Sequence, residues 1–172
     1  MDFLELAKTR YSCRNFENKP IEQEKINKIL EAAHISPTAC NFQPQRILVL
    51  TDEKELSKLS ECTKFGWCAP VIMIICYDKN ISWKRKYDGS DEGIVDASII
   101  TTHMMLEATD LGLGTTWIGS FDPQKVREVY NVPENYEIIS ILPIGYPSKD
   151  DVPNNKHFDR EPISKTTFYN KF

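Results

Sequence analysis

Residues 93–111 constrain the fold most, because they predict a helix that is apolar around nearly its whole circumference. Such a helix must be buried on all sides, and in a chain of 172 residues that is easier at a subunit interface than inside one thin domain. The pattern therefore favours a homodimer, with a monomer whose sheet and tail cover the helix as the alternative. Gly112 would end the helix. The apolar residues are Ile94, Val95, Ala97, Ile99, Ile100, Met104, Met105, Leu106, Ala108 and Leu111.

The rest of the chain alternates between patterns typical of helices and of strands. Apolar spacing and capping residues predict helices, and short apolar runs predict buried strands. Residues 78–92 are polar and contain Asp88-Gly89, which is typical of a loop or a mobile lid. Helices are expected over 2–9, 22–35, 52–62 and 123–130, and strands over 46–51, 71–77, 114–118 and 137–145.

Composition excludes several classes of protein. The formal net charge is −4, so the chain has no electrostatic footprint for nucleic acid or an anionic membrane surface. No apolar run approaches the ~20 residues that span a bilayer. The five cysteines lack CxxC spacing, which argues against a disulfide framework or a zinc site and favours a reducing cytoplasm. The length fits a single domain over residues 1–172.

The end of the chain, residues 146–172, has little periodicity and is interrupted by Pro147, Pro153 and Pro162. A plain loop of this length is uncommon in a compact domain. The tail is either disordered or wrapped around a partner subunit. Its apolar residues favour wrapping, because disordered segments rarely keep so many; they are Ile163, Phe168, Tyr169 and Phe172.

The first candidate for binding chemistry is the segment Arg10-Tyr11-Ser12-Cys13-Arg14. If it is extended, Arg10, Ser12 and Arg14 project from one face. Two guanidinium forks and a hydroxyl are suited to a phosphate group. The same short pattern is also typical of a solvated basic patch after a helix.

A second candidate is the loop from Ser36 to Pro44, in which Pro44 pushes Gln43 toward extended geometry. Asn41 and Gln43 would then point the same way. Each amide carries donors and acceptors, which suits the polar edge of a flavin ring. An ordinary irregular loop, with these amides bonded to their own backbone, is the equal alternative.

Two further candidates are weaker. The stretch 112–119 is rich in glycine, and its Trp117 suits packing beside a planar ring, although a helix C-cap and a core strand explain it as well. Lys156, His157 and Arg160 could return positive charge to the phosphate, or form a solvated cluster. Asp96, on the long apolar helix, is expected to cap or hydrogen-bond a neighbouring backbone and has no catalytic role.

Taken in order, these segments resemble the nitroreductase-like FMN-dependent oxidoreductase family. The resemblance covers most of the chain, and the combination and spacing of its parts carry it. These parts are RYSCR at 10–14, EAAHISPTACNFQP at 31–44, APVIMII at 69–75, LGLGTTWIG at 111–119 and LPIGYP at 142–147.

The resemblance implies an α+β fold with a mixed central sheet flanked by helices. It also implies an intertwined homodimer with a swapped C-terminal tail and two FMN sites at the interface. One subunit would hold phosphate and ribityl through Arg10, Ser12 and Arg14, with Arg160 returning to the phosphate. The other would bring Pro37, Thr38, Ala39 and Asn41 to the flavin, with Gln43 nearby, while Trp117, Ile118 and Gly119 would lie along the ring.

The activity implied is a ping-pong transfer of electrons from NADH or NADPH to a nitroaromatic, a quinone or a similar small acceptor. The flavin would carry the chemistry, so no catalytic side chain is required. Two alternatives stay open. One is a relative that cleaves the flavin or acts as a specialised dehalogenase or dehydrogenase, and the other is a non-enzymatic flavin-binding sensor.

Overall fold

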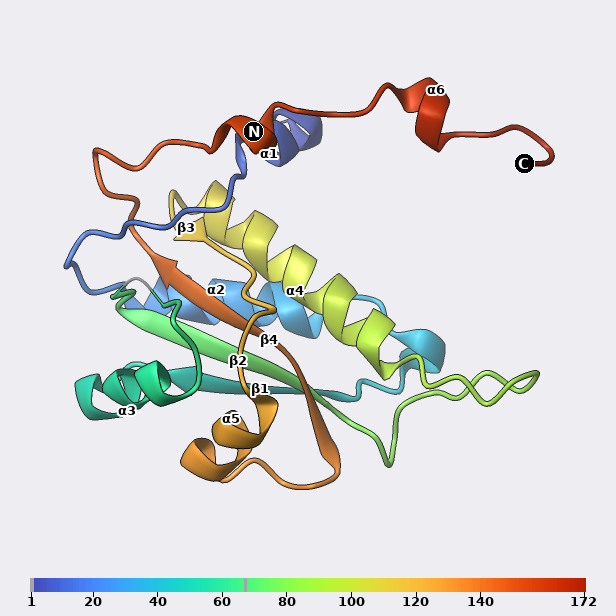
Figure 1. Ribbon diagram of the computed structural model, residues 1–172, viewed down its shortest axis with the longest axis horizontal. Coiled ribbons are helices and arrows are strands. Elements are labelled where there is room, and N and C mark those ends of the chain that lie inside the picture. The colour runs from blue at the N-terminus through green and yellow to red at the C-terminus, as the bar shows by residue number, and fades with distance from the viewer. Residues whose placement is uncertain (1, 67) are drawn as a thin grey trace.

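A four-stranded sheet lies between two layers of helices in the computed structural model, which describes residues 2–66 and 68–172 (Figure 1). The strand order is β1-β2-β4-β3, and every pair of neighbouring strands is antiparallel. The expected α+β class is therefore present, but the sheet is antiparallel rather than mixed. The strands are β1 Gln45–Leu50, β2 Val71–Asp78, β3 Gly114–Thr115 and β4 Tyr136–Gly145.

Parallel pairing is confined, in the described part of the chain, to one isolated bridge between Ser12 and Thr115. The N-terminal segment meets the edge of the sheet there and leaves it after one residue pair, so no parallel strand forms.

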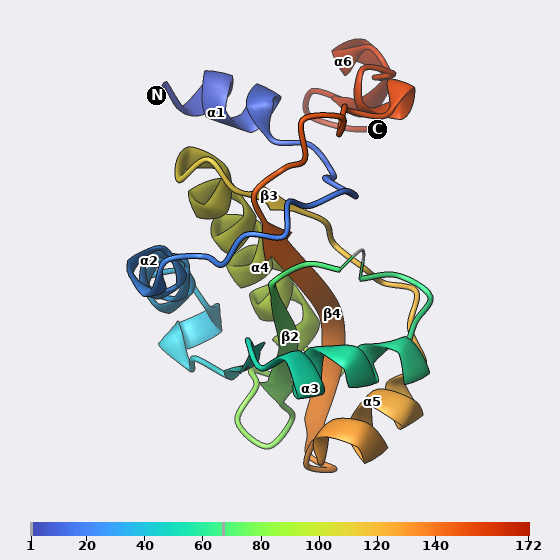
Figure 2. The same cartoon turned by 90° about the vertical axis from the view of Figure 1, so that its left-hand side faces the viewer.

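Strand β2 explains the layering, because all eight of its residues are buried. Successive side chains of a strand point to opposite faces. Met73 and Ile75 join the core formed with α2 (Gln23–His34) and α4 (Gly93–Asp110), whereas Ile72 and Ile74 join the core beneath α3 (Glu53–Ser57) and α5 (Pro123–Tyr130). Figure 2 shows these two helix pairs on opposite sides of the sheet.

Local capping signals place several helix ends as the sequence predicts. Asp122 accepts hydrogen bonds from two backbone N–H groups of the first turn of α5, and Pro123 occupies its first position. Gly112 lies just beyond α4 with φ +76°, the left-handed geometry that glycine adopts freely. The predicted helix over 52–62 is instead divided into α3 and a 3₁₀ helix, η2, at Lys58–Glu61.

Two segments differ from expectation. The predicted strand 114–118 is reduced to β3, and Ile118 forms only an isolated bridge with Ile141. Residues 78–92 form a projecting arm (Figure 1) whose two sides meet at a bridge between Lys84 and Asp91. The same two residues form an ion pair at 2.5 Å, so the arm is braced.

Helix α4 is buried on one side only within a single chain. Ala97, Ile100 and Met104 are fully buried against the sheet. Ile94 and Val95 are 52% and 46% exposed. The expectation of burial on all sides is therefore not met by one chain alone.

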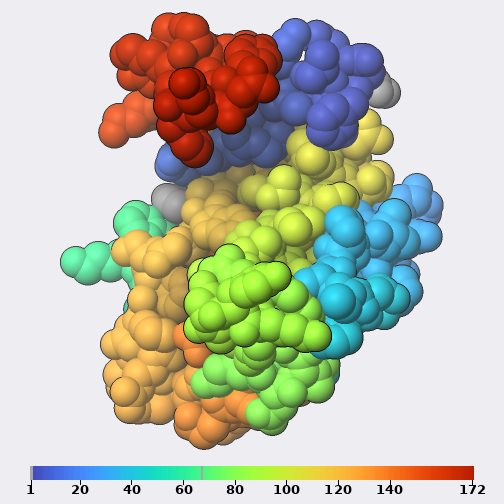
Figure 3. All heavy atoms as spheres, turned by 90° about the vertical axis from the view of Figure 1, so that its right-hand side faces the viewer, coloured from blue at the N-terminus to red at the C-terminus, as the bar shows by residue number. Residues whose placement is uncertain are grey.

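The N-terminal helix and the C-terminal tail lie at the same end of the molecule (Figure 3). Helix α1, Phe3–Thr9, lies beside the 3₁₀ helix η3, Asn155–His157, and a contact of 3.3 Å joins the His157 ring to the Lys8 carbonyl. Beyond η3 the tail carries a short helix, α6 at Ile163–Thr166, and every residue from 158 onward is exposed.

Candidate functional site

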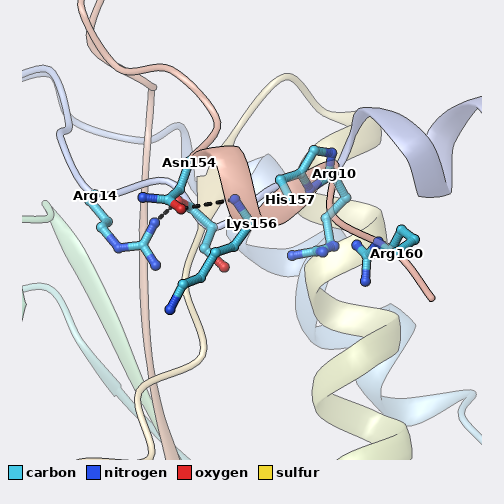
Figure 4. A pocket seen from close by; sticks show the side chains of 7 residues that line it. Arg10, Arg14, Asn154, Lys156, His157 and Arg160 are labelled. Atoms are coloured by element: carbon cyan, nitrogen blue, oxygen red, sulfur yellow. Dashed lines mark hydrogen bonds between the residues drawn. The ribbon is translucent and has the colours of Figure 1, made fainter.

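A cavity of about 390 Å³ opens between the N-terminal segment and the tail (Figure 4). Three of its lining residues belong to the first predicted group and three to the cluster predicted in the tail. The structure thus brings together two groups that are about 140 positions apart in the sequence. The lining residues are Arg10, Ser12, Arg14, Asn154, Lys156, His157 and Arg160.

The N-terminal segment is extended, and it is fixed to the edge of the sheet through Cys13. The Cys13 N–H donates to the Thr115 carbonyl at 3.0 Å, and the Thr116 hydroxyl donates to the Cys13 carbonyl. Gly114 permits this approach, because a Cβ there would lie 2.6 Å from the Cys13 side chain. Since Cys13 is fully buried, alternation turns its neighbours Ser12 and Arg14 toward the cavity.

Asp151 joins the tail to this segment. One of its carboxylate oxygens accepts the N–H groups of Arg14 and Asn15, at 3.2 and 3.0 Å. The Ser148 N–H donates to the Asn15 carbonyl at 2.9 Å. These bonds fix the start of the tail. The tail residues that follow therefore form the wall of the cavity opposite the N-terminal segment.

The cavity is strongly cationic. Arg10, Arg14, Lys156 and Arg160 contribute positive charge, no carboxylate lines the wall, and none of these four forms an ion pair with a described residue. Figure 4 shows the guanidinium groups of Arg10 and Arg160 side by side. Burial lowers the pKa of Arg10, and the charge of Arg160 lowers it further. The arrangement is suited to an anion with several acceptor oxygens, such as a phosphate monoester.

The second predicted group forms what we call the amide loop, residues 37–43. It contains a short 3₁₀ helix, η1 at Ala39–Asn41. Cys40, Asn41 and Gln43 have φ values of 51°, 55° and 50°, a left-handed geometry that asparagine tolerates but that is costly for cysteine and glutamine. Such backbone strain often accompanies a binding site. Asn41 and Gln43 are both exposed.

Internal hydrogen bonds shape the amide loop. The Gln43 N–H donates to the Thr38 hydroxyl at 3.1 Å, and the Asn41 N–H donates to the Thr38 carbonyl at 3.0 Å. Outside the loop, Asp96 of α4 accepts the Ala39 N–H at 2.9 Å. The expectation that Asp96 binds a neighbouring backbone is confirmed.

One chain keeps the cationic cavity and the amide loop apart. The amide loop lies beside the N-terminal end of α4, where the Ala39 N–H donates to Asp96; the light-blue segment that follows α2 lies there in Figure 1. The N-terminal segment is paired with Thr115, just beyond the other end of this helix. Since α4 has 18 residues, the two sites are separated by a helix about 27 Å long.

The third predicted group is split. Ile118 is a core residue, 3% exposed, and its N–H and carbonyl are both paired with Ile141. Trp117 is half-buried and Gly119 is exposed. A Cβ at Gly119 would meet only the Trp117 ring, at 3.9 Å. Trp117 and Gly119 can therefore contact a ligand at this surface, whereas the Ile118 side chain cannot.

Two residues of the cavity region were missed from sequence. Asn154 lines the cavity and accepts the N–H of Lys156, the turn pattern in which an asparagine bonds two residues ahead. Its position between Pro153 and Asn155 was a usable signal. Asp151 gave no local signal, because its partners lie near the other end of the chain.

Metal binding, catalysis by a buried thiol and a membrane-spanning helix find little support in the part of the chain that the structure describes. No group of three or more His, Cys, Asp or Glu side chains there could hold a metal ion. Burial raises the pKa of Cys13 and of Cys76 to about 12, so neither thiol is a ready nucleophile. No helix among residues 2–66 and 68–172 is both long and apolar enough to cross a membrane.

Comparison with known proteins adds an independent finding. The sequence model described as Nitroreductase family matches residues 7–66 and 62–146. A protein of Archaeoglobus fulgidus named "Putative NADH dehydrogenase/NAD(P)H nitroreductase" is 35% identical over 155 residues, which cover 86% of each chain.

Solved structures extend the similarity to the whole chain. A nitroreductase family protein from Clostridium difficile is 42% identical, with a TM-score of 0.94 over 100% of both chains. A second protein from Clostridium difficile, described as an FMN-dependent nitroreductase, is 29% identical, with a TM-score of 0.81 over 99% of this chain and 100% of that one.

Proposed function

The chain belongs to the nitroreductase family, and from that premise we propose that it is a homodimeric, FMN-dependent oxidoreductase that takes electrons from NADH or NADPH. The cationic cavity is the observation that carries this proposal. Its walls present cations and a hydroxyl without a compensating carboxylate, which is the donor set that a phosphate monoester needs.

The residues present fit FMN. Arg10 and Arg14 would hold the phosphate from the N-terminal segment, with the Ser12 hydroxyl as a further donor. Arg160 would close the site from the tail. Lys156 and His157, on the same wall, would add positive charge.

A second copy of the chain would complete the site. Within one chain the amide loop and the cavity lie at opposite ends of α4, so we propose that Pro37, Thr38, Ala39, Asn41 and Gln43 of one subunit approach the flavin held by its partner. The exposed Ile94 and Val95 on α4 support an interface there. The tail would wrap the partner, and it has the exposed apolar side chains to do so: Ile163, Phe168, Tyr169 and Phe172.

FMN would supply the redox chemistry, accepting a hydride from NADH or NADPH and passing electrons to the acceptor. The protein's own part is to bind and orient. Trp117 and the open backbone at Gly119 would border the ring, with Ile118 serving as their core anchor. Donor and acceptor would use the same place in turn, and the acceptor would be a nitroaromatic, a quinone or a similar small molecule. A reducing cytoplasm fits the five cysteines, all of which are free.

An absorbance spectrum combined with stopped-flow addition of NADH and of NADPH tests this proposal. The purified protein, loaded with FMN, should be yellow and should bleach with one or both nicotinamides. A protein that cannot be loaded with FMN would contradict it. Bound FMN without turnover would point to a sensor, and cleavage products of the flavin would point to the flavin-cleaving alternative.

A further inference from the structure

Two described side chains outside the amide loop form hydrogen bonds to its backbone, and these two bonds differ greatly in strength. Arg46 donates to the Gln43 carbonyl at 3.4 Å, and its side chain is 36% exposed. Asp96 accepts the Ala39 N–H at 2.9 Å and is 2% exposed. Hydrogen bonds to a charged, buried acceptor are stronger than neutral or exposed ones. Asp96 is therefore the principal anchor of the loop.

The second oxygen of Asp96 makes this carboxylate unusual. Its Oδ2 atom is buried and has no hydrogen-bond partner among the described residues. Burying a carboxylate costs free energy unless its oxygens are paired. Stability alone therefore does not account for a carboxylate that bonds one loop N–H and leaves its other oxygen unpaired.

The position of Ala39 shows what the anchor controls. It immediately precedes Cys40 and Asn41, which adopt the left-handed geometry, and Gln43 follows two residues later. Cys40 and Gln43 are strained in this geometry, so the loop keeps this shape only if something fixes its start. Without Asp96, its remaining bonds are internal apart from the long one to Arg46.

We infer that Asp96 is a positioning residue for the cofactor, which acts through the Ala39 N–H to hold the amides of Asn41 and Gln43 in the orientation that meets the ligand. This inference rests on the proposed function, because it takes the flavin as that ligand. Asp96 itself touches no reacting atom.

The test compares three variants of the full-length protein. Asp96→Ala removes the acceptor, Asp96→Asn keeps an oxygen that can accept the Ala39 N–H, and Thr101→Val is the matched control. Thr101 is a fully buried polar residue of the same helix, and its hydroxyl bonds only within the helix, to Ala97. Two quantities are measured: the dissociation constant for FMN, and hydrogen exchange of residues 37–43 against the rest of the chain.

Asp96→Ala should weaken FMN binding about tenfold and should speed exchange in residues 37–43 alone. Asp96→Asn should stay within about threefold of the natural protein in FMN binding, and Thr101→Val should leave both quantities unchanged. A rescue by asparagine would separate positioning from a need for negative charge.

Two failures are distinguishable. If the natural protein does not bind FMN, the proposed function is wrong. If it binds FMN and Asp96→Ala binds equally well, or if exchange in that variant rises throughout the chain, only the inference about Asp96 is overturned.

Discussion

The cationic cavity and the amide loop are built in opposite ways. The cavity is completed within one chain, where Asp151, Ser148 and His157 join the tail to the N-terminal segment. The amide loop depends mainly on one buried carboxylate, and its strained backbone faces outward. This difference suggests that, in the proposed FMN site, the cavity provides most of the binding affinity and the amide loop orients the flavin.

The largest effect is expected from the cavity. Replacing Arg14 with alanine should weaken FMN binding by roughly 1.5–3 kcal/mol, because it would remove the charge-assisted contact that we propose between Arg14 and the phosphate. Equilibrium titration of the apoprotein with FMN measures the change. Arg85→Ala is the control, since Arg85 lies on the projecting arm and pairs with Asp88. Unchanged affinity in Arg14→Ala would remove Arg14 from the site.

A second prediction concerns the close contact between Gly114 and Cys13, which holds one wall of the cavity against the sheet. Gly114→Ala should lower the free energy of unfolding by about 1–3 kcal/mol, because the new methyl group would collide with Cys13 and push the N-terminal segment off the sheet. FMN affinity should fall with it. Gly119→Ala, where a Cβ meets nothing closer than 3.9 Å, should leave stability unchanged. Equal denaturation midpoints for the two variants would contradict this account.

In the amide loop, by contrast, a substitution should raise the free energy of unfolding rather than lower it. Cys40 is exposed and has φ 51°, so Cys40→Gly relieves strain while removing no buried contact. We expect stability to rise by about 0.5–1 kcal/mol, since the relief exceeds the entropy that glycine adds to the unfolded chain. Chemical denaturation measures it. A clear loss of stability would mean that the loop is not strained.

The smallest effect depends on pH. Burial raises the pKa of Asp96; the hydrogen bond from the Ala39 N–H opposes this, and the charges of Glu92 and Asp91 add to the rise, so the net shift is upward. A carboxyl whose pKa is higher in the folded state makes its stabilising contribution at low pH, and that contribution is lost as pH rises from the ordinary aspartate value of 3.8 through the folded-state pKa.

Asp96→Asn should therefore gain stability relative to the natural protein as the pH rises from the ordinary aspartate value of 3.8 toward neutrality. Thermal unfolding of both proteins across this range measures the difference. A difference that is constant with pH, or that changes in the other direction, would contradict the raised pKa.

The sequence predicted local features well, because their signals are local. Asp122 with Pro123 and the glycine at 112 placed two helix ends, and the alternation of Arg10, Ser12 and Arg14 predicted one face of the cavity. One chain leaves Ile94 and Val95 of α4 exposed, and apolar periodicity cannot say which chain covers that side of a helix. Ile118 was expected beside the ring, but its side chain is in the core. Its pairing with Ile141 is a long-range contact that spacing does not reveal.

The contribution of Asp151 could not be predicted for the same reason. Its two backbone partners are 137 and 136 positions away in the sequence. By contrast, the approach of the tail to the first arginines was implied by family resemblance, and the structure places Arg160 in the cavity with them.

The central claim is that the cavity of one subunit and the amide loop of another meet around one FMN. A mixed dimer of one Arg14→Ala subunit and one Asp96→Ala subunit tests it directly. If the site is shared between subunits, this dimer contains one doubly altered site and one intact site, and it should bind one FMN with the affinity of the natural protein. If each site lies within a single subunit, neither site is intact, and the mixed dimer will bind FMN no better than the weaker variants alone.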